Sequence, residues 1–298
     1  MVRQYKIHTN LDGTDDKIWD VTNGKVRFYQ PSNLGLQSTN NIWQSNGVGV
    51  MGTRSITQPQ IEFKLETFGE SLEENYRLMK DFINDILNQK FVTLEYQTEI
   101  FQVYADLALA DVTKTEGYGK NGTFSEKITF DIITKWYTYE NLTFDMIQNG
   151  KVIAGKSKIY GGIAPGNYKY IKGTSYTYYG ESNIERLSRW DIKDEIFSFM
   201  GILYPKLPKT PTGVRFLDDI GNEYTAIVFK TEESQDYILI NTDVNDETYQ
   251  GWKGTTALNL FPVMDFERYR TRIIEKGQME LINLSKAEFK VKRKADFV

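Results

Sequence analysis

Two residue types that carry out much enzyme chemistry are scarce in this chain of 298 residues. It has one histidine, His8, and no cysteine, which excludes thiolate nucleophiles, disulfides, iron–sulfur clusters and thiolate zinc sites. A Ser-His-Asp triad or a multi-histidine metal site would need His8, which alternates with apolar neighbours in an expected first strand. We interpret His8 as a strand residue near a turn. Carboxylate-only chemistry such as glycoside hydrolysis stays possible, although no pair stands out among 40 acidic residues.

Two glycine motifs and two acidic clusters have the spacing of ligand-binding loops. Residues 47–52 and 117–122 match G-x-G-x-x-G, but a dinucleotide site needs a helix N-terminus after the motif, and both motifs lead into expected strands. Residues 10–16 and 243–247 gather oxygen ligands that suit calcium, yet neither has the register of an EF-hand, and Asx-rich turns explain both. We therefore predict no catalytic residue, no metal and no cofactor.

The C-terminal half carries basic and aromatic residues that suggest two other kinds of partner. The basic run over residues 286–294 could contact phosphates, but it alternates with apolar residues and fits a solvated strand face or a protected edge. Tyr249, Trp252 and Phe261 could stack on sugar rings, although packing inside a sandwich explains them equally well. A carbohydrate-binding module or a carboxylate-dependent glycosidase is therefore the alternative function.

Composition indicates a globular, mainly β protein with two domains. Apolar residues make up 40% of the chain and charged residues 26%, and the 14% of aromatic residues favours strands. A net charge of -4 gives no basic field, so we expect neither membrane binding nor sequence-specific nucleic-acid binding. No stretch has the length of a membrane span, and the N-terminus lacks the apolar core of a signal peptide, so we expect the chain to be made in a cytosol.

The sequence pattern of the first 136 residues predicts a sheet with one helix. Ser71 and Glu74 have capping-box spacing, and apolar residues then recur at helical spacing, which predicts a helix over 71–88. Alternating apolar residues predict strands over 2–8, 17–21, 25–29, 60–67, 91–96, 101–110 and 123–133. Between them, residues 31–52 form an Asn-, Ser-, Gly- and Gln-rich connection. A connection this long inside a domain is usually functional or packed against a partner.

Residues 149–180 contain six tyrosines, many glycines and few aliphatic residues. The segment is too poor in Leu, Val and Ile to form a core of its own. Large amphipathic rings on permissive backbone are typical of protein interfaces. We interpret the segment as an interface that projects from the second domain; an ordinary hairpin-rich stretch with half-buried tyrosines is the alternative.

The rest of the chain predicts a β-sandwich that begins with a short helix. Ser182 and Glu185 form a second possible capping box, and a partial apolar stripe predicts a helix within 181–200. Three prolines break the chain after it. Short strands separated by turns are then expected over 214–217, 224–230, 237–241, 257–263, 269–275 and 287–294.

Three segments stand out along the chain: Val-Arg-Phe-Tyr-Gln-Pro-Ser-Asn-Leu-Gly-Leu at 26–36, Ile-Thr-Phe-Asp-Ile-Ile-Thr-Lys-Trp-Tyr at 128–137, and residues 237–249. Together with this order of elements, they resemble the distal tail protein (Dit) family of long-tailed siphophages, and its lactococcal members most of all. The resemblance covers essentially the whole chain. It implies a non-enzymatic structural protein of the virion, assembled in the host cytoplasm, that forms a hexameric ring at the tail tip.

The resemblance also implies a different role for each domain. Residues 1–136 would form a β-sandwich-like ring domain, and residues 137–298 a galectin-like sandwich with an arm and hand at about 145–200. The arm would hold trimers of receptor-binding protein, and the ring would join the tail tube protein to the tail-associated tip protein. Galectins read sugar with a histidine, an asparagine and an arginine, and the second domain has no histidine, so no galectin-type site is expected.

Two sets of residues are expected to make these contacts. Ring subunits need surfaces that match a neighbour, and we expect Leu34, Leu36 and Trp43 of the 31–52 connection to lie on one, with tethering inside the subunit as the alternative. The arm tyrosines expected to touch the receptor-binding protein are Tyr168, Tyr170, Tyr176, Tyr178 and Tyr179.

Overall fold

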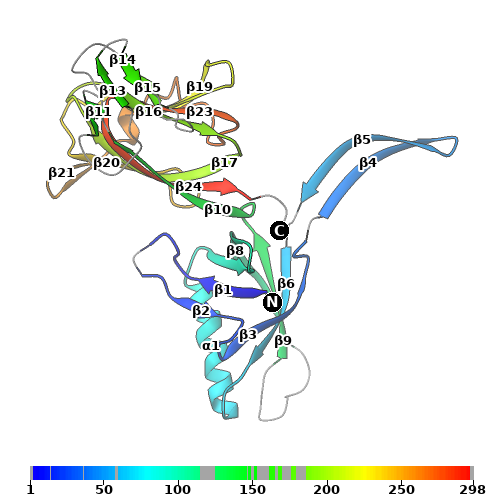
Figure 1. Ribbon diagram of the computed structural model, residues 1–298. Helices are drawn as coiled ribbons and strands as arrows, with labels where there is room; N and C mark the ends of the chain where they lie inside the picture. Colours follow the sequence, from blue (N-terminus) through cyan, green and yellow to red (C-terminus); the bar gives the residue numbers. More distant parts are fainter. Residues whose placement is uncertain are drawn as a thin grey trace. The chain divides into compact units, whose positions relative to one another are not determined.

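The computed structural model of the chain is mainly β (Figure 1). It describes residues 3–13, 15–35, 37–57, 60–114, 125–145, 147–148, 151–152, 161–164, 167–169, 176–178 and 186–295. The chain divides into two compact units, one made of 1–138 with 295–298 and the other of 139–294, each with its own apolar core. The domain boundary expected at residue 136 lies close to this division. Nowhere in the described ranges is a helix both long and apolar enough to cross a membrane.

The first unit is a curled antiparallel sheet with strand order β2-β1-β7-β8-β9-β6-β3. The two ends of the sheet meet where Phe28 N–H of β3 donates to the Val21 carbonyl that follows β2, at 2.7 Å. In β6, Ile61, Phe63 and Leu65 are buried while the residues between them lie on the other face. The strands are β1 (Gln4–His8), β2 (Ile18–Asp20), β3 (Val26–Ser32), β6 (Gln60–Thr67), β7 (Val92–Gln97), β8 (Gln102–Thr113) and β9 (Ser125–Ile132), which confirms the predicted strands.

The predicted helix is confirmed as α1 (Leu72–Leu87). Ser71 Oγ accepts the N–H of Glu74 at 3.2 Å, which satisfies one of the free donors of the first turn. Phe82 and Ile86 are buried in the core of the first unit, and Trp19 packs edge-on against Phe82. The helix therefore covers the sheet through a narrow apolar stripe, as its sequence pattern predicts.

The second unit is a sandwich of two sheets. One has the order β10-β24-β17-β20-β21-β22, and the other contains β16-β23-β18-β19. The first sheet consists of β10 (Tyr137–Asp145), β17 (Ile196–Pro205), β20 (Tyr237–Asn241), β21 (Thr248–Lys253), β22 (Thr256–Asn259) and β24 (Leu284–Lys294). The second consists of β16 (Arg186–Ile192), β18 (Thr212–Leu217), β19 (Glu223–Phe229) and β23 (Gly277–Ile282), extended by β11 (Ile147–Gln148), β12 (Lys151–Val152) and β15 (Tyr176–Tyr178).

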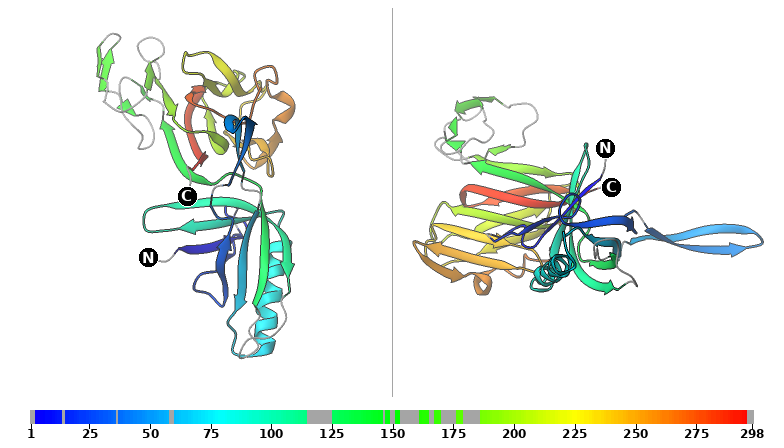
Figure 2. Two further views of the ribbon diagram at one scale, coloured as in Figure 1. Left: turned by 90° about the vertical axis from the view of Figure 1, so that its right-hand side faces the viewer. Right: turned by 90° about the horizontal axis from the view of Figure 1, so that it is seen from below.

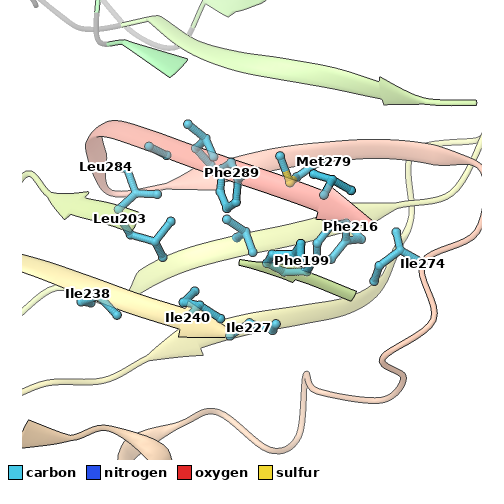
Figure 3. Close-up of a cluster of buried hydrophobic side chains, with 14 of the residues drawn as sticks. Phe199, Leu203, Phe216, Ile227, Ile238, Ile240, Ile274, Met279, Leu284 and Phe289 are labelled. Carbon is cyan, nitrogen blue, oxygen red and sulfur yellow. The ribbon is translucent and has the colours of Figure 1, made fainter. Parts of the chain in front are cut away.

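The core of the second unit lies between its sheets. Figure 3 shows Phe199 from β17 among Phe216 and Phe289 from two other strands, and both ring centroids are 5.8 Å from that of Phe199. Each large apolar side chain that is fully buried contributes about 1.5–3 kcal/mol. Side chains alternate along each strand between the core and the outer face of the sandwich. The residues that fill the core therefore determine which residues of each strand point outward.

Two sequence-based assignments in the second unit are wrong, and two of its strands were missed. The helix predicted within 181–200 is absent, since residues 186–192 and 196–205 are β16 and β17, and Ser182 and Glu185 lie outside the described residues. β17 is rich in β-branched and aromatic residues and is paired on both edges, by β20 and β24, which overrides the weak helical stripe. The strand predicted over 269–275 is reduced to one bridge between Ile274 and Ile196, and β21 and β23 were not predicted.

The strand predicted over 257–263 is shorter than expected. β22 spans Thr256–Asn259, and the chain then turns into a short 3-10 helix over Phe261–Val263. Pro262 lies inside this turn and has no N–H for a sheet. Asn259 Oδ1 accepts the N–H of Phe261 at 3.0 Å, which holds the change of direction.

Candidate assembly surfaces

Residues 31–52, expected to be a long connection, instead form most of an extended β-hairpin. It consists of β4 (Gln37–Ser45) and β5 (Val48–Thr57), with Trp43 opposite Val50 and Ser45 opposite Val48. Asn46 and Gly47 close the hairpin with φ of 50° and 79°, the positive values that a tight two-residue hairpin turn requires. In Figures 1 and 2 this β4–β5 hairpin runs away from the rest of the first unit as a thin ribbon.

The tip of the β4–β5 hairpin is apolar and exposed on both faces. Trp43, Val48 and Val50 share one face and are 69%, 67% and 64% exposed. Ile42 and Met51 share the opposite face and are also exposed. A two-stranded hairpin is at best marginally stable alone in water, and contiguous exposed apolar side chains mark interaction sites. The hairpin therefore presents exposed apolar side chains on both of its faces.

The three residues expected to make ring contacts differ in where they lie. Trp43 lies near the hairpin tip and is the most exposed of the apolar residues there. Leu34 is only 9% exposed and packs in the core of its own unit, which agrees with the alternative of tethering inside the subunit. Leu36 lies outside the described residues. Sequence reasoning missed Val48, Val50 and Met51, although the Asn46-Gly47 dipeptide is a strong hairpin signal.

The tyrosine- and glycine-rich segment contributes several short strands. β13 (Gly161–Ala164) and β14 (Asn167–Lys169) pair with each other, and β15 pairs with β16 with Tyr176 opposite Ser188. Since β16 also pairs with β23, the segment is connected by hydrogen bonds to the sheet of the second unit. Tyr168, Tyr176 and Tyr178 lie in β14 and β15, whereas Tyr170 and Tyr179 lie outside the described residues.

His8 is buried at the end of β1 between two carboxylates. Its Nδ1 lies 2.7 Å from Asp16 Oδ2, and its Nε2 lies 2.8 Å from Glu95 Oε2. Lys6 Nζ donates to the other Glu95 oxygen at 3.0 Å. Two acceptors are satisfied only when both ring nitrogens carry protons, so His8 is held as an imidazolium. Neither ring nitrogen is left to act as a base, and His8 instead fastens the 10–16 turn to the sheet.

The His8 cluster makes the stability of the first unit depend on pH. Burial alone would lower the pKa of His8, but the hydrogen bonds to Glu95 and Asp16 outweigh it and raise this pKa above 6.5. The hydrogen bond from His8, opposed by burial and helped by Lys6, lowers the pKa of Glu95 to about 2. The contribution of His8 is complete below pH 6.5 and lost as pH rises through its raised pKa. That of Glu95 is complete above pH 4.5 and lost as pH falls toward about 2.

We therefore expect His8→Gln to destabilise the protein more in mild acid than in alkali. Charged hydrogen bonds contribute about 2 kcal/mol, so thermal unfolding at about pH 6 should show a clear loss that shrinks toward about pH 9. The wild-type chain measured over the same pH series is the control. A loss of equal size at every pH would contradict an imidazolium at this position.

The two acidic clusters serve as turns. Asp16 Oδ1 accepts the N–H of Asn10 at 3.0 Å, and Asp243 Oδ1 accepts the N–H of Asn245 at 2.9 Å. Asp243 also pairs with Lys292 Nζ at 2.9 Å, and both side chains are buried. Lys292 is thus an exception to the solvated face expected for the basic run over 286–294. In the part of the chain that the structure describes, no group of three acidic or histidine side chains is arranged to hold a metal.

The aromatic residues considered for sugar stacking have other rings as neighbours. Tyr249 is buried in the core of the second unit. Trp252 stacks on Tyr237 with ring centroids 6.0 Å apart and an angle of 11°. Phe261 is exposed and packs against Phe266, with a centroid distance of 5.1 Å. Ring packing inside the unit therefore accounts for Tyr249 and for one face of Trp252.

Two family models match the chain side by side. The model for the N-terminal domain of the distal tail protein matches residues 4–133, and the model for the C-terminal domain of Dit matches residues 135–298. The distal tail protein of Lactococcus phage p2 is 95% identical, and that of Lactococcus phage SK1 is 91% identical, each over the full length of both chains.

Solved structures also match the chain. A chain in a structure of the phage p2 baseplate, in its activated conformation with calcium, matches with a TM-score of 0.80 and 95% identity over 100% of both chains. The Dit protein of SPP1 matches with a TM-score of 0.50 over 97% of this chain and 98% of that one. Its identity is 12%, so this likeness concerns the fold alone.

Proposed function

This chain belongs to the distal tail protein family, and from that premise we propose that it forms a hexameric ring joining the tail tube to the receptor-binding machinery. It is a structural component of the phage tail baseplate and hence of the virion. Its assembly with other tail proteins follows from that place, and we propose that assembly begins in the cytoplasm of the host. The tail tube protein and the tail-associated tip protein are the proposed neighbours of the ring on either side.

The observation that carries the ring proposal is the β4–β5 hairpin. In a closed ring each subunit presents one surface to the next and a different surface to the one before. An extended hairpin with Trp43 and Val50 near its tip fits this role, because it can leave its own unit and be covered by a neighbour. Each of these side chains contributes about 1.5–3 kcal/mol on burial, which is absent in the isolated subunit. The mass of the purified protein in solution tests the ring directly.

We assign the receptor-binding protein to the tyrosine- and glycine-rich segment. The support is its composition and its connection through β15 and β16 to the second unit, away from the hairpin in the chain. Tyrosine rings supply large contact area at low entropic cost. In this proposal the first unit closes the ring, and the second unit holds trimers of the receptor-binding protein.

Deleting residues 150–180 should keep the ring and abolish capture of receptor-binding protein. The expected reason is that the deletion removes β12 to β15 but leaves the β4–β5 hairpin in the other unit. Co-purification with tagged receptor-binding protein measures capture, and light scattering on the same sample measures the ring. A matched variant with Tyr168, Tyr176 and Tyr178 changed to serine keeps the chain length. Capture that survives the deletion would falsify the arm assignment.

A further inference from the structure

The sheet of the second unit that ends in β22 has an open edge. β22 pairs with β21 on one side, and among the described residues no element pairs with its other side. The opposite sheet ends in β19, and this edge is covered by the chain itself. Lys230 N–H donates to Val263 O at 3.0 Å, Asp265 N–H to Val228 O at 2.8 Å, and Ala226 N–H to Arg268 O at 2.9 Å. Among the described residues, the sandwich thus covers the β19 edge with the irregular segment over 263–268 and leaves the β22 edge unpaired.

The strand register identifies which backbone groups of β22 point outward. Lys253 and Thr256 are opposite each other across the Gly254 turn, so they form the hydrogen-bonded pair that closes the hairpin. Leu258 faces β21 in the same way, and the N–H of Leu260 donates to Tyr249 O at 2.9 Å. Because the pattern alternates, the N–H and C=O groups of Ala257 and Asn259 point away from the sheet.

The side chains along this edge are uncharged, and apolar residues follow it. β22 reads Thr256-Ala-Leu-Asn259, and all four residues are exposed. Exposed Leu258 lies in β22 and exposed Phe261 lies just after it, where exposed Phe266 packs against Phe261. Natural proteins usually protect open edges with charged residues or proline, and β22 has neither. Its length of 4 residues limits pairing to a short segment.

We propose that β22 accepts an extended, uncharged segment of another baseplate protein, which adds to the sheet as a strand. Outward N–H and C=O groups in alternation are satisfied by a polypeptide in β conformation, and the exposed apolar residues offer contacts to its side chains. A second copy is disfavoured as the occupant, because β22 pairing with β22 is two-fold and does not close a six-fold ring. The baseplate setting rests on the proposed function; the open edge does not.

Amide hydrogen exchange on the isolated chain and on purified baseplates tests the proposal. The amides of Ala257 and Asn259 should exchange freely in the isolated chain and at least about tenfold more slowly in the baseplate. The amides of Leu258 and Leu260 face β21 and serve as protected controls in both samples. Equal, fast exchange of Ala257 and Asn259 in both samples would overturn the proposal. Protection of the β4–β5 hairpin in the same data reports separately on the ring, so the two proposals can fail independently.

A pair of variants and a cross-link identify the occupant. Ala257→Pro removes one outward donor, and Ala257→Val keeps it. Baseplates with proline should lose protection of Asn259, and those with valine should retain it; equal protection in both would count against strand addition. Because the chain has no cysteine, Ala257→Cys provides a unique thiol for a short cross-linker. A cross-link to a different baseplate protein supports the proposal, and one only to a second copy overturns it.

Discussion

Changing Trp43 and Val50 to serine together is expected to convert the proposed ring into monomers. The two side chains lie opposite each other near the tip of the β4–β5 hairpin, and each gains about 1.5–3 kcal/mol if a neighbour buries it. Loss of about 3 kcal/mol per contact weakens each contact roughly a hundredfold. Since a closed ring needs every contact, the mass measured by light scattering should fall to that of one chain over a wide range of concentration.

The same variant should fold like the wild-type chain, because both side chains are exposed in the isolated subunit. Its thermal unfolding midpoint is therefore an internal control. Ile100→Ser is the matched control, because Ile100 is 88% exposed in the same unit and lies in the turn between β7 and β8. A ring that persists in the double variant, or that is lost equally in Ile100→Ser, would refute the role assigned to the hairpin.

The largest loss of stability is expected from Gly277→Ala in the second unit. Gly277 begins β23 with a φ of 147°, and a Cβ there would lie 2.0 Å from the backbone oxygen of Leu217. The neighbour is backbone in β18, so it cannot rotate aside as a side chain could. Backbone strain and overpacking together should cost about 3 kcal/mol or more, which lowers the unfolding midpoint of a unit this size by roughly 6–12 °C.

Gly35→Ala is the control for this prediction. A Cβ added at Gly35 meets no atom within 4 Å, so the substitution adds a methyl group without a clash. It should leave the midpoint unchanged or raise it slightly, because alanine reduces the conformational freedom of the unfolded chain. Calorimetry on both variants gives the comparison. A Gly277→Ala chain that unfolds at the wild-type temperature would show that β18 and β23 are not held together as tightly as this contact indicates.

Strong local signals in the sequence predicted much of the first unit. The strict alternation of Ile61, Phe63 and Leu65 and the Ser71 cap with its helical stripe each match one kind of element within a few residues, so they agree with the pairing and packing found in the structure. The helix predicted within 181–200 was wrong over the part that forms residues 196–205, because the apolar residues there follow no single periodicity. Pairing with β20 and β24 decides its conformation, and both partners are distant in the sequence.

The assembly surfaces were only partly predictable for a related reason. Trp43 was expected to lie on a neighbour, and the structure leaves it exposed. Leu34 was expected on the same surface, yet the core of its own unit buries it. A single bulky residue in a polar stretch does not show whether its own unit or a neighbouring subunit covers it. The polar composition around Asn46 and Gly47 also suggested a loop, whereas those two residues are the turn that allows a hairpin.

The β4–β5 hairpin has a consequence for the life of the unassembled protein. Its outer strand edges and exposed apolar tip can template unwanted pairing between free chains as readily as they can complete an assembly. A free subunit is thus prone to aggregate. It stays soluble only if assembly incorporates it faster than it pairs with another free subunit in the wrong register. Overproduction without the neighbouring tail proteins should favour aggregates, and supplying those neighbours together should restore soluble particles.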